Sequence, residues 1–366
     1  VFDEVDRRWA HAALADGAES DEERARHLGR ATTTPDEAIA AALESAAVVA
    51  RQRGALAVSA QLLVESAELT PVVDDDRRGR RLLDAGHSCF AAGDIDKARS
   101  LFQTLVTAFP ESAIRVEARW RLGTVLDETG DVAGAIRLWQ EALAATDDRR
   151  LTSIIERGLP YSTMYTEGLD AAARHAEAAV TSAESCGDSG ALAFALAASA
   201  IVAVLQGSPD YEALLERALR LDSGLDVLGE WCPVEVSAEC GRLTGEIVRT
   251  RTLYEAVLSR AAETGETGSE QWAAFGLTST ELLAGRLGRA RELLGTVLDL
   301  TDQTGLMQIP GAGLAVNVAA HAGDLDEART LARETIANAR DAHEHMYELN
   351  LLHGLGFIEA SAGDHT

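Results

Sequence analysis

One stretch near the end of the chain, HEHMYELNLLH at residues 343–353, holds the densest group of residues that could bind a metal. His345 and Glu348 are three residues apart, so a helix would place both side chains on one face. The stretch is not the H-E-x-x-H zinc motif, because Tyr347 stands where the second histidine would be. A solvated helix end is the favoured interpretation, and a ligand or metal contact stays open as the alternative.

Other motifs that could do chemistry are weaker. CGDSGA at 186–191 resembles the nucleophile motif of chymotrypsin-like proteases, but those enzymes are β-barrels and here the motif lies between expected helices. GAGLAV at 311–316 lacks the third glycine of a dinucleotide loop. No phosphate-binding G-x-x-x-x-G-K-[ST] loop is present, since the only lysine, Lys97, lies in GDIDKA. We expect no enzyme, no cofactor and no metal in this chain.

The cysteines and the apolar segments predict a cytoplasmic protein. The four cysteines form no C-x-x-C pair and have no zinc spacing, so we interpret them as reduced thiols that mostly fill the core. The most apolar run, ALAFALAASAIVAVL at 191–205, is shorter than a membrane span and predicts a buried helix. We expect no signal peptide and no membrane contact.

Composition and charge narrow the class of protein. The 366 residues carry a net charge of −26, and a surface this acidic repels phosphates, so we expect no direct nucleic-acid binding by this segment. Hydrophobic residues make up 46% and aromatic residues only 5%, a balance that favours alanine- and leucine-rich helices. Arginine almost replaces lysine, which indicates a GC-rich genome such as that of an actinobacterium.

A glycine recurs through the chain with a period of about 38 residues. The recurring positions are Gly54, Gly93, Gly130, Gly168, Gly207, Gly245, Gly285, Gly323 and Gly363. An amphipathic, helix-length segment lies on each side of the glycine. Glycine accepts the left-handed backbone that ends a helix, and Asp94 or Asp324 directly after it can cap the next helix. The repeat therefore predicts pairs of antiparallel helices.

Small and large residues recur at fixed places after this glycine. An alanine five residues on would let two helices approach closely, and a large residue one turn later would fill the remaining space. The alanines are Ala98, Ala135, Ala173, Ala290 and Ala328, and the large residues include Phe102, Trp139 and Leu294. This is the A-x-x-x-F element of the tetratricopeptide pattern, and Gly86 and Gly123 match its earlier L-G element. We predict an all-α solenoid of about eight to nine helix pairs, wound as a right-handed superhelix.

The opening of the chain resembles a known family. RRWAHAALA, ERARHL and PDEAIAAALESAA, all within residues 7–54, are similar to the segment after the ATPase and winged-helix modules of large ATP-binding LuxR-family regulators, the family of the maltose regulator. The resemblance implies a helical segment at 1–53 and a repeat solenoid at 54–366. It also implies ATPase and DNA-binding domains outside these residues. Because the chain stops at "AGDHT", we expect the last repeat to be truncated and the natural protein to continue past Thr366.

From the resemblance we expect a sensor region that binds a small-molecule inducer or a partner protein in a concave groove. Its own ATPase and DNA-binding domains would be further partners, with ATP bound only there. The repeat phase turns candidate ligand-binding residues inward: Arg119, Trp120, Trp272, Glu281 and His321. The two tryptophans could instead be core residues. A ligand-free scaffold for oligomerisation or autoinhibition stays open as the alternative function, and so does a homo-oligomer.

Overall fold

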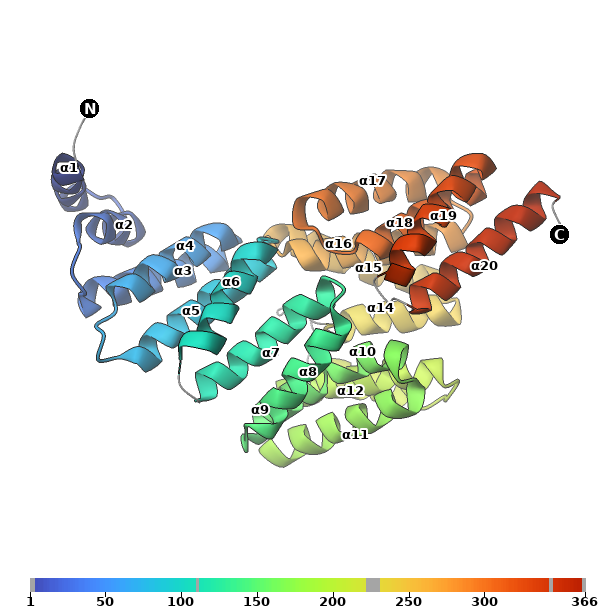
Figure 1. The fold of residues 1–366 in the computed structure, drawn as a ribbon, viewed down its shortest axis with the longest axis horizontal. Helices are drawn as coiled ribbons and strands as arrows, with labels where there is room; N and C mark the ends of the chain where they lie inside the picture. Colours follow the sequence, from blue (N-terminus) through green and yellow to red (C-terminus); the bar gives the residue numbers. More distant parts are fainter. Residues whose placement is uncertain (1–3, 110–111, 222–230, 342–344, 364–366) are drawn as a thin grey trace. The chain divides into compact units, whose positions relative to one another are not determined.

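The computed structural model describes residues 4–109, 112–221, 231–341 and 345–363, and every regular element in these ranges is an α-helix. The first helices are α1 (Glu4–Asp16), α2 (Asp21–Ala31), α3 (Glu37–Gln52), α4 (Leu56–Leu69), α5 (Asp75–Ala91), α6 (Ile95–Ala108), α7 (Ala113–Glu128) and α8 (Val132–Ala144). The next are α9 (Arg149–Glu156), α10 (Leu159–Thr166), α11 (Leu169–Cys186), α12 (Ser189–Leu205), α13 (Tyr211–Leu221) and α14 (Pro233–Thr244). The last are α15 (Ile247–Thr264), α16 (Thr267–Leu283), α17 (Leu287–Thr304), α18 (Gln308–Ala322), α19 (Leu325–Asp341) and α20 (His345–Ala362). The predicted all-α class is confirmed (Figure 1).

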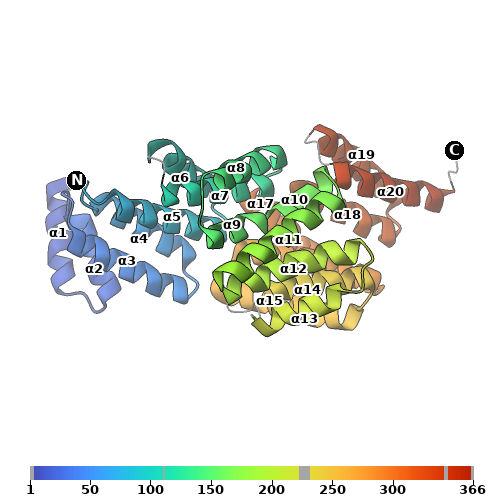
Figure 2. The same ribbon diagram turned by 90° about the horizontal axis from the view of Figure 1, so that it is seen from below.

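The chain folds into two compact units. Unit 1 comprises Val1–Val125 with Glu263–Glu266, and unit 2 comprises Leu126–Ala262 with Thr267–Thr366. Within unit 1, α3, α4, α5 and α6 lie side by side in chain order. Within unit 2, α18, α19 and α20 do the same (Figure 2). The boundary predicted between residues 53 and 54 falls at the turn from α3 to α4 and stays a prediction, as does the handedness of the superhelix.

The nine spaced glycines all have a left-handed backbone, with φ between 71° and 94°. Gly93 shows what the turn does: its N–H donates to the Phe90 carbonyl, and the N–H of Asp94 donates to the Cys89 carbonyl, both at 2.9 Å. These bonds satisfy carbonyl groups that the end of a helix leaves without partners. The same six-residue bond recurs at Ala55, Asp131, Ser208, Glu246, Arg286 and Asp324.

At some of these turns the residue after the glycine is an aspartate that caps the next helix. The Asp94 carboxylate accepts the Lys97 N–H at 3.3 Å, and the Asp131 carboxylate accepts the Gly134 N–H at 3.0 Å, so each caps its helix. Asp324 also accepts a bond from the Arg291 guanidinium, at 2.9 Å. The Gly-Asp pair therefore ends one helix and begins the next.

The small-residue slot lies in the interior. Ala98, Ala135, Ala290 and Ala328 are all 0% exposed. After Gly168 the fully buried alanine is Ala172, one position earlier than expected, whereas Ala173 is only partly buried. The reason is a shorter turn: Gly168 itself precedes α11 directly, whereas one residue separates Gly93, Gly130, Gly285 and Gly323 from the helices that follow them.

Large residues pack against glycines on neighbouring helices. The Phe102 ring lies so close to Gly86 that a Cβ there would come within 2.5 Å of it. Tyr254, which stands in the same place of its own pair as Phe102, lies even closer to Gly276, where a Cβ would come within 2.2 Å of the ring. Trp139 is buried and faces Gly158, while Gly123 is buried within α7. Paired glycine and aromatic positions thus set how closely the helices approach.

The first helix of one pair is broken in two. α9 ends at Glu156 and α10 begins at Leu159, with Pro160 in its first turn. Proline has no N–H to donate to the carbonyl four residues earlier, which interrupts the helix there. Counting α9 and α10 together, the first helices of successive pairs in unit 2 touch one another from α10 through α12, α14, α16 and α18 to α20. We call this set the first-helix row.

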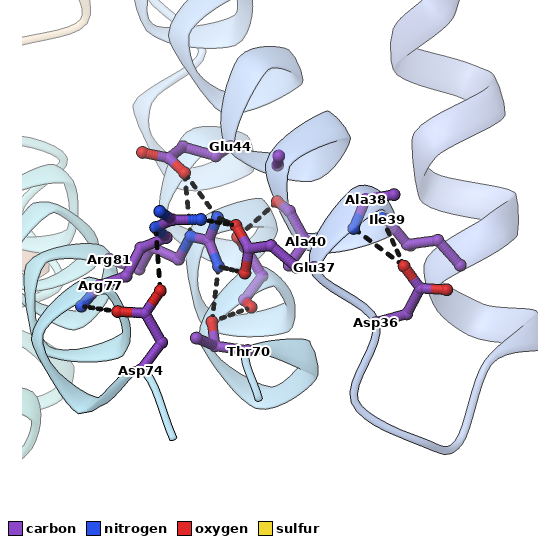
Figure 3. Close-up of polar contacts among 12 residues, drawn as sticks. Asp36, Glu37, Ala38, Ile39, Ala40, Glu44, Thr70, Asp74, Arg77 and Arg81 are labelled. Atoms are coloured by element: carbon purple, nitrogen blue, oxygen red, sulfur yellow. Dashed lines mark hydrogen bonds and ion pairs between the residues drawn. The ribbon is translucent and has the colours of Figure 1, made fainter. Parts of the chain in front are cut away.

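A buried arginine ties α5 to α3 in unit 1 (Figure 3). Arg81 is 1% exposed, and its guanidinium donates to both Glu37 oxygens at 2.8 and 3.0 Å. It also donates to Glu44 at 2.9 Å and to the Thr70 hydroxyl at 2.6 Å. Arg77 adds a third bond to Glu37, at 2.6 Å. Two carboxylates and a hydroxyl thus compensate one buried charge.

The network predicts a pH dependence of stability. The hydrogen bond from Arg81 is the main cause that lowers the pKa of Glu37 below its ordinary value of 4.5. A lowered folded-state pKa means that the stabilisation is complete above pH 4.5 and is lost as the pH falls through the lower, folded value. Urea unfolding from pH 7 to pH 3 should therefore show the stability difference between wild type and Glu37→Gln shrinking toward pH 3. A difference that stays constant would contradict this.

None of the described helices is long and apolar enough to cross a membrane. The apolar run at 191–205 lies in α12, and most of its side chains are buried.

Candidate functional site

Four aromatic side chains from distant parts of the sequence meet in unit 2. We define the aromatic cluster as Tyr161, Trp231, Trp272 and Phe275. Tyr161 lies on α10, Trp272 and Phe275 lie on α16, and Trp231 directly precedes the residue that caps α14. Their ring centroids follow one another at 4.8 Å, 5.1 Å and 5.7 Å. Helices of the first-helix row therefore carry three of the four rings.

The rings turn progressively along the cluster. Tyr161 and Trp231 stack with 13° between their planes, Trp231 and Trp272 are tilted by 51°, and Trp272 meets Phe275 edge-on at 75°. Tyr161 is buried, whereas the other three are only partly buried. The result is a folded aromatic wall with a buried base and a surface that solvent reaches.

The backbone at Trp231 is strained. Its φ is 59°, in the left-handed region that bulky residues avoid. The next residue, Cys232, begins α14: its N–H donates to the Glu235 carboxylate at 3.2 Å, and Pro233 occupies the first turn. Such strain persists only where surrounding contacts fix it. The Trp231 ring has two such contacts, because it stacks on Tyr161 and packs at a tilt against Trp272.

This strain predicts an unusual order of stabilities. Trp231→Gly and Trp231→Ala both remove the ring, but only glycine adopts a positive φ without a steric cost. The left-handed conformation costs an alanine about 1–2 kcal/mol, of which the greater chain entropy of unfolded glycine cancels part. Urea unfolding should find Trp231→Gly more stable than Trp231→Ala by about 0.5–1 kcal/mol. Equal stabilities, or a more stable alanine variant, would contradict the left-handed assignment.

Acidic residues at the end of α7 border the cluster. The Trp272 indole N–H donates to the Glu128 carboxylate at 3.5 Å, and the Ser162 hydroxyl donates to the Asp127 carboxylate at 2.7 Å. Glu128 is the last residue of α7, where the helix dipole also places partial negative charge. One side of the aromatic wall is therefore electrically negative.

Tyr161 contributes a polar atom to the buried base. Its hydroxyl is buried and has no hydrogen-bond partner, and burial raises the pKa of the phenol well above its ordinary value. Buried hydroxyls normally have a partner, and leaving one without costs about 1–3 kcal/mol. The base of the cluster therefore carries an unused donor and acceptor.

The structure separates the residues that the repeat phase predicts as ligand-binding. Arg119 and Trp120 lie on α7 in unit 1, whereas Trp272, Glu281 and His321 lie on α16 and α18 in unit 2. Of these five, Trp272 alone belongs to the aromatic cluster. Trp120 is 5% exposed, and the guanidinium of the adjacent Arg121 lies 4.2 Å from the centre of its ring.

The other two predicted residues have local partners. Glu281 is 2% exposed, accepts a bond from Arg251, and lies 3.9 Å from the Arg286 guanidinium. His321 is exposed, donates its Nδ1–H to the Asn317 carbonyl at 2.8 Å, and stacks on Phe357 with 5.3 Å between ring centroids. The side chain of His345 lies outside those that the structure describes.

Three cysteines, Cys89, Cys232 and Cys240, are buried in a form that does not favour the reactive thiolate. Burial raises the pKa of Cys89 to about 11 and that of Cys240 to about 12, and burial also raises the pKa of Cys232 well above its ordinary value. Thiols react as thiolates, so these three are core residues at neutral pH. Among the described residues, no group of three or more His, Cys, Asp or Glu side chains is placed to hold a metal.

Comparisons with known proteins agree with this architecture. Residues 82–112 match the tetratricopeptide repeat family. The structure of a Rap protein complexed with Competence and Sporulation Factor is similar at a TM-score of 0.55, with 10% identity over 90% of this chain and 99% of that one. The apo form of RapI reaches 0.54, with 12% identity over 72% and 98%.

A signal-transduction ATPase with a tetratricopeptide repeat sensor from Pyrococcus horikoshii gives a TM-score of 0.47, with 13% identity over 98% of this chain and 62% of that one. No curated protein sequence matches this chain. The fold is an array of tetratricopeptide-like helix pairs, a class typical of protein-interaction and sensor domains.

Proposed function

We propose that the chain is the ligand-sensing repeat region of a regulator and that the aromatic cluster in unit 2 is its binding site. The observation that carries the proposal is the folded aromatic wall on the first-helix row, partly open to solvent and bordered by Glu128. Tryptophan is enriched at protein interfaces relative to the rest of the surface. A Rap protein of the same fold class is a complex with Competence and Sporulation Factor, which supports a peptide as ligand.

The wider assembly follows from the resemblance of residues 7–54 to ATP-binding LuxR-family regulators. In this proposal the repeats act in the cytoplasm and pass the bound state to ATPase and DNA-binding domains outside these residues. A ligand that fits one arrangement of the helix pairs better than another shifts the population toward it. Trp231 is suited to report the ligand, because it directly precedes Cys232, the N-cap of α14.

Selection from a displayed random-peptide library tests the binding site, with a parallel thermal-shift screen of small metabolites. Ligands recovered on the wild-type chain should bind at least tenfold more weakly to Trp272→Ala. Trp9→Ala is the matched control, because Trp9 is 76% exposed on α1, outside the cluster. Ligands that bind both variants equally would remove the aromatic cluster from the proposal.

A second candidate function, a scaffold for oligomerisation or autoinhibition, has one observation in its favour. α20 exposes Leu349, Leu352 and Phe357 at helical spacing, by 66%, 39% and 46%. Apolar residues at this spacing form one face of a helix, which a partner could cover. Light scattering would decide: a self-associating chain whose mass falls with Leu349→Glu favours the scaffold, and a monomer excludes oligomerisation.

A further inference from the structure

The aromatic cluster has features that select for the charge of its ligand. Indole and phenyl faces carry negative electrostatic potential and attract cations, most strongly at tryptophan. Trp231 and Trp272 are in contact, with ring centroids 5.1 Å apart and planes tilted by 51°, and Phe275 meets Trp272 edge-on. All three side chains are only partly buried, so a cation could lie on the parts of the rings that solvent reaches.

The charges beside Trp272 are negative. Glu128 lies 3.5 Å from the Trp272 indole nitrogen, Asp127 precedes it, and the negative end of the α7 dipole coincides with both. The cation Arg157 acts on the other end of the cluster: its charge opposes the rise in the pKa of the buried Tyr161, and its guanidinium lies 4.4 Å from the centre of the Phe194 ring. At long range, the net charge of −26 draws cationic ligands toward the chain and repels anionic ones.

We propose that the aromatic cluster binds an arginine side chain of a peptide ligand, with the guanidinium against Trp231 and Trp272 and its charge opposite Glu128. Arginine fits better than lysine, because the planar guanidinium stacks on aromatic faces and is less strongly hydrated than an ammonium group. This inference rests on the proposed binding function and adds the charge and the shape of the group that is bound.

Glu128→Gln isolates the charge. Glutamine keeps a carbonyl oxygen that accepts the Trp272 N–H and changes only the net charge beside the rings. Glu216→Gln is the control, because Glu216 is 73% exposed on α13 in the same unit, where it pairs with Arg220. Each variant changes the net charge by one, so any difference between them is local.

The experiment uses 19F NMR of the full chain labelled with 5-fluorotryptophan, which gives one signal for each of the five tryptophans. The probes are the capped pentapeptide Gly-Gly-Arg-Gly-Gly and the same peptide with citrulline, which has the shape of arginine without its charge. We expect the arginine peptide to shift the signals of Trp231 and Trp272 saturably, and those of Trp9, Trp120 and Trp139 to stay in place. The citrulline peptide should bind about tenfold more weakly.

Glu128→Gln should weaken binding of the arginine peptide about fivefold or more and leave binding of the citrulline peptide unchanged. Glu216→Gln should change the affinity for neither peptide. Equal affinity for the two peptides, no shift with either, or an unaffected Glu128→Gln variant would overturn the arginine proposal. A selected peptide that depends on Trp272, lacks arginine and ignores Glu128→Gln would refute this inference and leave the proposed binding function standing. Free arginine at the same concentration separates recognition of a peptide from that of the amino acid, and equal binding of both would refute the peptide assignment.

Discussion

Phe102→Ala is expected to lower the free energy of unfolding by about 3–5 kcal/mol. The ring is 1% exposed and packs on Gly86 of the preceding helix, where no side chain could move in to fill the space that alanine would leave. Urea unfolding followed by far-UV circular dichroism measures the change. A loss below about 1 kcal/mol would show that Phe102 is not packed between α5 and α6.

A double-mutant cycle tests the contact itself. Gly86→Ala alone should destabilise by about 1–3 kcal/mol, because its Cβ would come within 2.5 Å of the Phe102 ring. In the Phe102→Ala background that Cβ has room, and alanine is the better helix former, so Gly86→Ala should become neutral or stabilising. Strictly additive effects would contradict the contact.

The double variant Glu37→Gln with Glu44→Gln is expected to cost about 3–5 kcal/mol, because it leaves the buried Arg81 without a carboxylate. The effect should exceed the sum of the two single changes, since each remaining carboxylate still compensates the guanidinium. Urea unfolding of all three variants gives the comparison.

An exposed ion pair supplies the matched control. Arg217 and Glu184 lie 2.7 Å apart with side chains 46% and 49% exposed, so Glu184→Gln should change stability by at most about 1 kcal/mol. If the double variant at Glu37 and Glu44 costs no more than this control, then Arg81 is solvated in solution and the buried network is not formed.

The helix pairs and their turns could be predicted from sequence because they depend on local, periodic features. A glycine with positive φ, an aspartate that caps the next helix and a buried alanine all lie within six residues, as at Gly93, Asp94 and Ala98. At Gly168 the prediction was wrong by one residue, because the fully buried alanine is Ala172 and not Ala173. The length of that turn depends on the conformation of Gly168, which the residue type alone does not specify.

Contacts between distant residues escaped prediction for a physical reason. Arg81 belongs to DDDRRGRR, a charge run whose local pattern indicates a solvated turn, and its partners lie some forty residues earlier on another helix. The aromatic cluster likewise joins residues 161, 231 and 272, and only Trp272 was singled out from the repeat phase. A signal near Trp231 was present, because Pro233 stands at the first position of α14, where proline is over-represented.

The turns at the spaced glycines are closed by main-chain atoms alone, as the bond from Asp94 N–H to the Cys89 carbonyl illustrates. A turn of this kind requires a glycine at the position with positive φ, and its closing bonds involve no side-chain atom. Whole helix pairs can therefore be duplicated, deleted or allowed to drift in sequence without breaking the turns of their neighbours. The array is in this sense modular, because the side chains along it can vary while the main-chain bonds of the turns stay closed.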